Sequence, residues 1–316
     1  MFRLLFELNR GVPNGTLRGV RGRGKSSLLD FPGKFTNYSG GIDMKKVLTI
    51  AGSDSSGGAG IQTDLKTFAA LGVYGMSAIT AITAQNTLGV KRVERVSASM
   101  VKDQIRAIFE DIEVDAVKIG MLAEIDIIEA VRDCMDLYRP KFVVLDPVMV
   151  STSGFDLLNS QAKKVLIEGL IPLVDLITPN LAETACILNL IGRAGLDIDS
   201  WAKMKEAGMI IAGHTGKNIL VKGGHLMDRP CDVLVTNDGR VYKYDHKRIN
   251  TKNTHGTGCT LSSAIAANVA KGYGLEEAVS RAKDFISKAI ENSLDIGRGC
   301  GPTDPMGDIY KSLGMV

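Results

Sequence analysis

The stretch 254–265, Thr-His-Gly-Thr-Gly-Cys-Thr-Leu-Ser-Ser-Ala-Ile, joins a glycine-rich turn to the expected start of a helix. Gly256 and Gly258 allow a tight turn, and a helix from about Thr260 adds unpaired amides and the positive end of its dipole. Such a structure is suited to binding an anion. Cys259 would lie in the first turn, where the same field favours a thiolate. The stretch therefore predicts an anion site beside a reactive thiol, although simple packing explains the glycines equally well.

Several other side chains that could bind a ligand or take part in chemistry follow short aliphatic runs, which are typical of buried strands. They are Gln85 after the run 76–84, Asp146 after 142–145, Asn180 after 176–178 and Lys222 after 218–221. In addition, the glycine loop 52–60, which begins at Gly52 after the run 47–51, allows the close approach of a ligand. Open α/β sheets bind ligands at the carboxyl ends of their parallel strands. We therefore expect these residues to gather at one edge of a sheet.

Each of these side chains has more than one possible role. Asp64, just inside a helix expected over 61–71, could bind a polar substrate group, but a helix cap is favoured. Gln85 offers both a donor and an acceptor and suits an aminopyrimidine, while a turn-forming cluster is equally compatible. Asn180 and Glu183 lie one turn apart at a helix start, where they could hold hydrated Mg²⁺ near phosphate or simply cap the helix. Lys222 is well placed to meet a nucleotide phosphate.

The elements that must position these residues alternate between strand and helix. Helical patterns cover 99–111, 124–138 and 275–292, and a turn signal at 237–239 joins two antiparallel strands. This alternation predicts an α/β fold with a mainly parallel sheet, helices on both faces and a hairpin at one edge. No linker divides the chain after Met44, so we expect one domain over 44–316.

Charge and composition argue against nucleic acid and membrane partners. Residues 1–43 carry a net charge of +4 and the whole chain +3, so the remaining residues sum to −1. This near-neutral body favours a small-molecule substrate over a nucleic acid. No apolar run approaches the ~20 residues that span a bilayer. Five scattered cysteines without a C-x-x-C pair fit free thiols in a reducing cytoplasm, and the four histidines show no zinc-site spacing.

The first 43 residues contain a match to the phosphate-loop pattern G-x-x-x-x-G-K-[ST] at 19–26. A working phosphate loop needs a buried strand before it and a helix after it. Here Pro13 precedes the match and Pro32 would end a following helix within about a turn. We therefore interpret the match as a coincidence, and 1–43 as a disordered extension, either a tag or upstream sequence, that the activity does not require; a transit peptide is the weaker alternative.

Taken together, six ordered motifs resemble the hydroxymethylpyrimidine and phosphomethylpyrimidine kinases of thiamin synthesis, which belong to the ribokinase-like superfamily. The motifs are Ala51-Gly52-Ser53-Asp54 through Gly57-Gly58-Ala59-Gly60 to Thr67, Ala84-Gln85-Asn86-Thr87, Asp146-Pro147-Val148, Thr178-Pro179-Asn180-Leu181-Ala182-Glu183, Val221-Lys222-Gly223-Gly224-His225 and Gly256-Thr257-Gly258-Cys259. The resemblance extends from Met44 nearly to the end of the chain. It implies a three-layer α/β/α sandwich.

The resemblance also implies a role for each site residue. Asp64 and Gln85 would hydrogen-bond the aminopyrimidine, in a pocket lined by Gly52, Met121 and Val148. Nucleotide and metal would be held by Asn180, Glu183, Lys222, Thr257 and Asp146, with Asp146 and Glu183 at the Mg²⁺. The catalytic set would be Lys222 with the anion hole formed by Gly256, Gly258 and Cys259. Most of the superfamily has an aspartate base where this chain has Cys259, a departure that the pyrimidine kinases share.

The reaction implied is transfer of the γ-phosphoryl group of MgATP to 4-amino-5-hydroxymethyl-2-methylpyrimidine and then to its monophosphate. A pyridoxal or pyridoxine kinase of the same superfamily is the nearest alternative, because its substrate is also a hydroxymethyl heteroaromatic compound. A nucleotide-binding regulator without catalysis is a third hypothesis. The resemblance favours a homo-oligomer, with a dimer first, and leaves a requirement for a monovalent cation open.

Overall fold

The computed structural model describes residues 44–149, 158–224 and 230–315. The phosphate-loop match at 19–26 and the predicted disorder of 1–43 lie outside the described residues, as does His225 of the fifth motif.

The described residues contain one sheet in the order β3-β2-β1-β4-β5-β6-β7-β8-β9. Its strands are β1 (Lys46–Asp54), β2 (Tyr74–Asn86), β3 (Gly89–Arg95), β4 (Ala116–Ile119), β5 (Val143–Leu145), β6 (Leu176–Ile177), β7 (Asn218–Gly223), β8 (Cys231–Val235) and β9 (Val241–Asp245). The strands β2, β1, β4, β5, β6 and β7 are parallel to one another. β8 and β9 form the antiparallel hairpin that the turn signal predicted.

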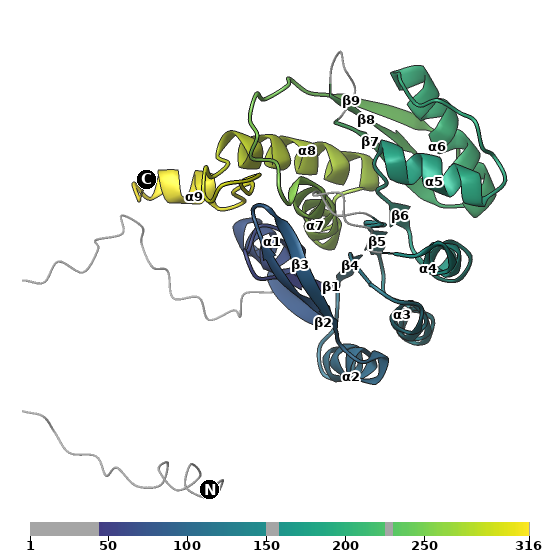
Figure 1. Cartoon of the computed structure of the whole chain (residues 1–316), viewed down its shortest axis with the longest axis horizontal. Helices are drawn as coiled ribbons and strands as arrows, with labels where there is room; N and C mark the ends of the chain where they lie inside the picture. Colours follow the sequence, from purple (N-terminus) through teal and green to yellow (C-terminus); the bar gives the residue numbers. More distant parts are fainter. Residues whose placement is uncertain (1–43, 150–157, 225–229, 316) are drawn as a thin grey trace, which may run out of the picture. The chain divides into compact units, whose positions relative to one another are not determined.

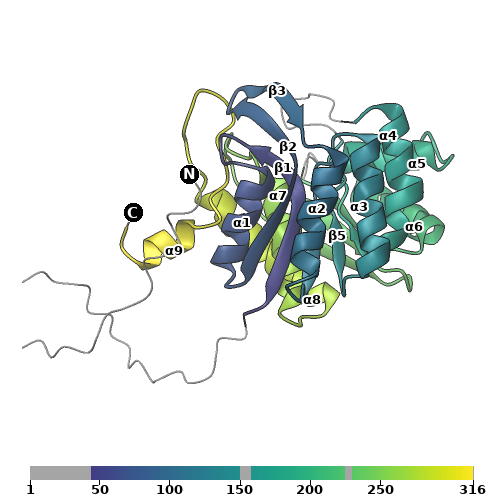
Figure 2. The ribbon, with the colours of Figure 1, turned by 90° about the horizontal axis from the view of Figure 1, so that it is seen from below.

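Helices cover both faces of this sheet (Figure 1). They are α1 (Gly60–Ala70), α2 (Ala98–Phe109), α3 (Ile125–Tyr138), α4 (Ser160–Val165), α5 (Leu181–Leu190), α6 (Trp201–Thr215), α7 (Thr257–Ala270), α8 (Leu275–Glu291) and α9 (Gly307–Ser312), with a π-helical turn (Leu166–Leu170) and a 3-10 turn (Ile171–Leu173) after α4. Figure 2 shows α2 to α6 in a row along one face. The three-layer α/β/α sandwich is therefore confirmed.

The strands hold two apolar layers apart because their side chains alternate between the faces. On β1, Leu48 and Ile50 belong to the layer shared with α2 to α6, whereas Val47 belongs to the layer shared with α1, α7 and α8. Leu48, Ile50 and Val47 are fully buried. Burying each such side chain contributes about 1.5–3 kcal/mol relative to exposure, so both layers fix the strands that carry the site.

Several elements differ from the sequence-based expectation, among them α7 and α6. α7 begins at Thr257, three residues earlier than predicted, because Gly256 turns the chain directly into the helix. α6 was missed altogether. Its buried side includes Ala207, Gly208 and Ala212, while Met209 is exposed, so its apolar residues do not form one clear stripe.

The strand order reverses beside β1. The chain leaves β1 through α1 to β2 on one side, and β4 then pairs with the other side of β1. Ligands of open α/β sheets bind beyond the carboxyl ends of the strands at such a point. No helix among the described residues is both long enough and apolar enough to cross a membrane.

Candidate active site

The start of α7 depends on a glycine, Gly256, that a larger residue could replace only if the neighbouring backbone moved. Gly256 is the residue before the helix and has a φ of 82°, a conformation that favours glycine. A Cβ atom on Gly256 would lie 1.8 Å from the backbone oxygen of Gly58 in the loop after β1. The first amides of the helix, including those of Gly258 and Cys259, have no acceptor within the helix. This geometry suits the predicted anion site.

An ion pair lies directly against this helix start. Lys222 Nζ is 2.7 Å from Asp146 Oδ1, and a Cβ atom on Gly258 would lie 3.3 Å from both Asp146 Oδ2 and Lys222 Nζ. Thr178 donates its hydroxyl to Asp146 Oδ1 at 3.2 Å, and Ser262 of α7 donates to Oδ2 at 3.4 Å. The ends of β5, β6 and β7 and the start of α7 therefore meet at Asp146.

Lys222 is held as a cation at this position. Burial lowers its pKa, but the carboxylates of Asp146 and Glu183 raise it further, so the pKa is above its ordinary value. The Lys222 side chain keeps 15% of its surface exposed while that of Asp146 keeps 3%. A positive charge that is accessible beside helix amides can meet a phosphate group.

Asn180 and Glu183 form the helix cap that was one of their two predicted roles. The Asn180 side chain accepts the Glu183 N–H at 2.9 Å, and Glu183 Oε2 accepts the Asn180 N–H at 2.8 Å, at the start of α5. Glu183 is 5% exposed. Burial raises the pKa of its carboxyl to about 7, with Lys222 opposing and Asp146 adding to the shift. Contact of Glu183 with Mg²⁺ remains a prediction.

Asp64 of α1 lies in a buried polar environment. Its carboxylate is fully buried and accepts hydrogen bonds from Thr49 at 2.6 Å and from Ser263 at 2.7 Å. Lys118 Nζ lies 2.8 Å from Asp64 Oδ2. The residue before α1 is Ala59, and no side chain caps this helix. The predicted helix cap is therefore wrong, and contact of Asp64 with substrate remains a prediction.

Lys118 was not predicted as a site residue, although its place in the sequence indicates a buried charge. The expected strand 116–119 is aliphatic except for this lysine, and all four of its residues are buried. A buried lysine needs a charged partner, so its presence in such a strand indicates a carboxylate on the facing element. Burial lowers the pKa of Lys118, but the Asp64 carboxylate more than reverses this, and the pKa lies above its usual value.

Cys259 lies in the first turn of α7 as predicted, but the expected effect on its pKa was wrong. Desolvation raises the pKa of the thiol to about 11, and Asp64 and Asp146 add to this while Lys118 opposes it. Burial therefore outweighs the nearby positive charge of Lys118. At neutral pH the thiol is protonated, so the structure provides no resident thiolate.

Two of the pocket residues predicted from the resemblance lie in contact. A Cβ atom on Gly52 would lie 2.8 Å from Met121 Cε, so a larger residue at 52 would displace the methionine. Val148 is half-buried two residues after Asp146, and Thr257 donates its hydroxyl to the Thr254 oxygen at 2.7 Å. Their contacts with substrate or nucleotide remain predictions.

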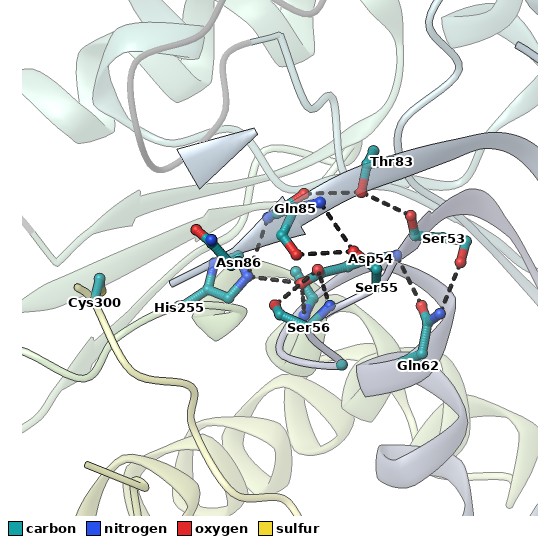
Figure 3. A network of polar contacts seen from close by, with 12 residues as sticks. Ser53, Asp54, Ser55, Ser56, Gln62, Thr83, Gln85, Asn86, His255 and Cys300 are labelled. Carbon is teal, nitrogen blue, oxygen red and sulfur yellow. Dashed lines mark hydrogen bonds and ion pairs between the residues drawn. The ribbon is translucent and has the colours of Figure 1, made fainter. Parts of the chain in front are cut away.

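Gln85 takes part in a polar network with two residues to which the sequence analysis gave no role (Figure 3). His255 Nε2 lies 2.8 Å from Asp54 Oδ2 and 3.3 Å from the Gln85 amide nitrogen. Gln85 is half-buried and its backbone N–H donates to Ser55 Oγ at 2.9 Å. His255 was visible in the opening motif, but a single histidine carries no spacing signal.

The residues also allow a test of whether Mg²⁺ fits. The described part of the chain has no cluster of three or more His, Cys, Asp and Glu side chains that could hold a metal. Mg²⁺ at phosphoryl-transfer sites commonly uses one or two carboxylates and completes its shell with water and phosphate oxygens. Asp146 and Glu183, which interact electrostatically, therefore fit a Mg²⁺ that arrives with nucleotide.

Comparison with known proteins identifies the relatives of this chain. Residues 54–304 match the family model described as phosphomethylpyrimidine kinase. A hydroxymethylpyrimidine/phosphomethylpyrimidine kinase of Rhizobium meliloti is 52% identical over 258 residues, which cover 81% of this chain and 94% of that protein. The crystal structure of phosphomethylpyrimidine kinase from Clostridium difficile is 47% identical, with a TM-score of 0.67, and the match covers 78% of this chain and 99% of that one.

A further solved relative is the pyridoxal kinase of Bacillus subtilis in an ADP complex. It is 36% identical with a TM-score of 0.76, and the match covers 84% of this chain and 99% of that one. From the family match, the identities and the arrangement around Asp146, Lys222 and the start of α7, we conclude that this chain is a phosphotransferase and belongs to the phosphomethylpyrimidine kinase family.

Proposed function

We propose that this chain phosphorylates 4-amino-5-hydroxymethyl-2-methylpyrimidine with ATP, and then phosphorylates the resulting monophosphate, as a step of thiamin synthesis. The observation that carries the proposal is the Lys222–Asp146 pair packed against Gly258 at the start of α7. The Lys222 cation lies beside the unpaired backbone amides of the helix start, and together these groups form a site for a phosphoryl group. The family and the Rhizobium relative supply the substrate class.

In each step the hydroxymethyl or phosphate oxygen forms a bond to the γ-phosphorus, and the bond from that phosphorus to the bridging oxygen of ADP breaks. In the first step the proton of the hydroxymethyl group is released to water. Lys222 is proposed to move from Asp146 towards the nucleotide phosphates, because its side chain is already partly exposed. The amides of Gly258 and Cys259 would hold the transferring group in line. Asp146 and Glu183 would hold Mg²⁺, which offsets negative charge on the phosphates.

We assign Cys259 a role through its backbone amide and its position, not as a resident base. Its thiol has a pKa of about 11 and is protonated at neutral pH. Phosphoryl transfer depends mainly on positioning and charge neutralisation, so the reaction does not require a thiolate.

A pyridoxal kinase is the second candidate, since the Bacillus subtilis pyridoxal kinase has the higher TM-score of the two solved structures compared. The lower identity of that enzyme and the family match favour the pyrimidine. We also propose a cytoplasmic location, supported by Cys134, Cys231, Cys259 and Cys300, which form no disulfide, and a dimer, supported by the resemblance alone.

An assay of ADP release with MgATP would test the function on hydroxymethylpyrimidine, its monophosphate and pyridoxal in parallel. Turnover of both pyrimidines well above that of pyridoxal is expected. Turnover of pyridoxal alone would assign the chain to the second candidate, and no turnover of any of the three would support the regulator hypothesis. Lys222→Met should lower kcat by roughly 10²-fold or more, while Lys91→Met, at an exposed position on β3, should leave it unchanged.

A further inference from the structure

Three polar side chains from distant parts of the chain meet beside the start of α7 (Figure 3). Asp54 ends β1, Gln85 lies near the end of β2, and His255 precedes the glycine turn. His255 Nε2 is 2.8 Å from Asp54 Oδ2 and 3.3 Å from the amide group of Gln85. Since His255 Nε2 faces both Asp54 and Gln85, the presence of a hydrogen on Nε2 decides whether each partner accepts or donates a hydrogen bond.

The hydrogen bonds of Asp54 determine whether His255 Nε2 carries a hydrogen. Its Oδ1 accepts the Ser56 N–H and the Ser56 hydroxyl, both at 2.8 Å, and its Oδ2 accepts the Ala59 N–H at 2.9 Å. Burial raises the pKa of Asp54, but hydrogen bonds from His255 and Ser56 lower it below its usual value. Asp54 is therefore a carboxylate, which only accepts hydrogen bonds. His255 must carry its hydrogen on Nε2.

This requirement sets the direction of the Gln85 amide. A protonated Nε2 cannot accept a hydrogen bond, so the Gln85 group that faces it is the carbonyl oxygen, which shares the hydrogen that Nε2 donates mainly to Asp54. The other end of the amide lies 3.2 Å from Thr83 Oγ1, whose single hydrogen is donated to the Ser53 oxygen at 2.9 Å. Thr83 therefore accepts from Gln85. Both conditions are met when the amide is turned so that its nitrogen faces Thr83 and its oxygen faces His255.

We propose that His255, kept in its Nε2–H form by Asp54, fixes the direction of the Gln85 amide and makes Gln85 select a ring with an acceptor nitrogen next to an amino group. With both partners in place, Gln85 keeps one N–H and one oxygen lone pair for a ligand. An aminopyrimidine edge complements that pair, whereas a ring without the amino group leaves the oxygen unpaired. The inference rests on the proposed function and makes His255 a positioning residue for specificity.

The first test measures the tautomer of His255 without any substrate. Nitrogen NMR of the full chain with ¹⁵N-labelled histidine distinguishes Nε2–H from Nδ1–H, and the spectrum of His255→Gln identifies the signal. The Nε2–H form is expected because Nε2 faces the Asp54 carboxylate. A neutral Nδ1–H form in the wild-type enzyme would overturn the proposal.

The second test compares KM with kcat in two variants. His255→Leu removes the donor, and the KM for hydroxymethylpyrimidine should rise about tenfold, the usual size of one hydrogen bond, while the KM for ATP is unchanged. His255→Gln restores an N–H donor and should recover most of the loss. His214→Gln, at an exposed histidine of α6, is the control. Equal pyrimidine KM values in His255→Leu and the wild type would overturn the proposal.

Selectivity separates a specificity role from a general structural one. The preference for the aminopyrimidine over 5-hydroxymethyl-2-methylpyrimidine, which lacks the amino group, should fall by about tenfold in His255→Leu because the amide can then turn. An equal loss for both substrates would show that His255 only supports the fold. If the wild-type enzyme phosphorylates neither pyrimidine, the proposed function fails, and the NMR result still judges the hydrogen-bond arrangement.

Discussion

Lys118 Nζ lies 2.8 Å from Asp64 Oδ2, and neither side chain is exposed to solvent. Lys118 comes from β4 and Asp64 from α1, while Thr49 of β1 and Ser263 of α7 donate to the same carboxylate. Ser263 lies one helical turn after Cys259. This single carboxylate therefore connects the start of α7 to the strands on either side of the point where the strand order reverses.

Removing one partner of this buried pair should destabilise the protein strongly. Lys118→Met leaves the Asp64 carboxylate buried without its counter-charge, and a loss of about 3–5 kcal/mol in the free energy of unfolding is expected. Chemical denaturation at neutral pH would measure it. A loss within about 1 kcal/mol would contradict the interpretation of Asp64 as a buried, paired carboxylate.

Two controls sharpen this measurement. The double variant Asp64→Asn/Lys118→Met removes both charges and should be more stable than Lys118→Met alone, because no uncompensated charge stays buried. Lys102→Met removes a pair of the same length, since Lys102 Nζ lies 2.8 Å from Asp133 Oδ2, but that pair is exposed. It should change the stability much less, because solvent screens exposed pairs.

The strands and the hairpin of the fold were predictable where the sequence has a clear aliphatic run or turn signal. The aliphatic strands and the turn at 237–239 gave the sheet and its hairpin correctly, because burial on both faces leaves a clear signal. β3 was missed because it is largely exposed and carries Lys91, Arg92 and Arg95. An exposed antiparallel strand has neither a continuous apolar run nor a helical period.

The sequence predicted which residues lie at the site, but it did not predict which of them form ion pairs or hydrogen bonds with one another. Asp146, Lys222 and Gly258 were placed at strand ends and a helix start, and the structure brings them together. Which side chains form a pair depends on which strands are neighbours in the sheet. The pattern of a single strand carries no information about its neighbours. For that reason the Asp64–Lys118 pair was not anticipated, and a thiol at a helix start was expected to ionise easily.

The ionisation of Cys259 can be measured by alkylation. Since burial raises its pKa to about 11, the rate of reaction with iodoacetamide should rise about tenfold per pH unit from pH 7 to about 10 without a plateau. Mass spectrometry of the Cys259 peptide would follow the reaction, with Cys300 as the internal comparison in the same sample. A plateau reached below pH 9 would show a thiolate that the helix start stabilises.

Replacing Cys259 tests whether its thiol takes the substrate proton. Because the thiol is protonated at neutral pH, Cys259→Ala should lower kcat by about tenfold or less and leave both KM values unchanged. Loss of a general base would cost about 10²–10⁴-fold instead. A loss in that larger range, together with recovery in a variant that carries another base at 259, would assign the thiol the role of catalytic base.

Removal of residues 1–43 should leave the kinase intact. The family match covers residues 54–304, and every site residue discussed above lies after Met44. A chain that starts at Met44 should therefore match the full chain in kcat, in the KM for ATP and in its unfolding midpoint. Lys25→Ala in the full chain is the companion variant. Weaker ATP binding in either would show that the phosphate-loop match at 19–26 takes part in the activity.

The buried carboxyl of Glu183 should make stability depend on pH. Its pKa is about 7 in the folded protein against 4.5 for an ordinary glutamate, so the folded state favours the protonated form. Its contribution to stability is complete below pH 4.5 and is lost as the pH rises through 7. Glu183→Gln keeps a capping-box residue but does not titrate. Its stability relative to the wild type should therefore increase from pH 5 to 8 by on the order of 2 kcal/mol.

Chemical denaturation in buffer with EDTA would measure this difference without Mg²⁺ at the carboxylates. Glu168→Gln, which alters an exposed glutamate that pairs with Lys164, is the matched control and should show no such trend. If the two variants follow the same pH dependence, Glu183 is ionised in the folded protein at pH 5. Its carboxylate would then be available to a cation throughout the neutral range, and the competition between proton and Mg²⁺ that its burial implies would not operate.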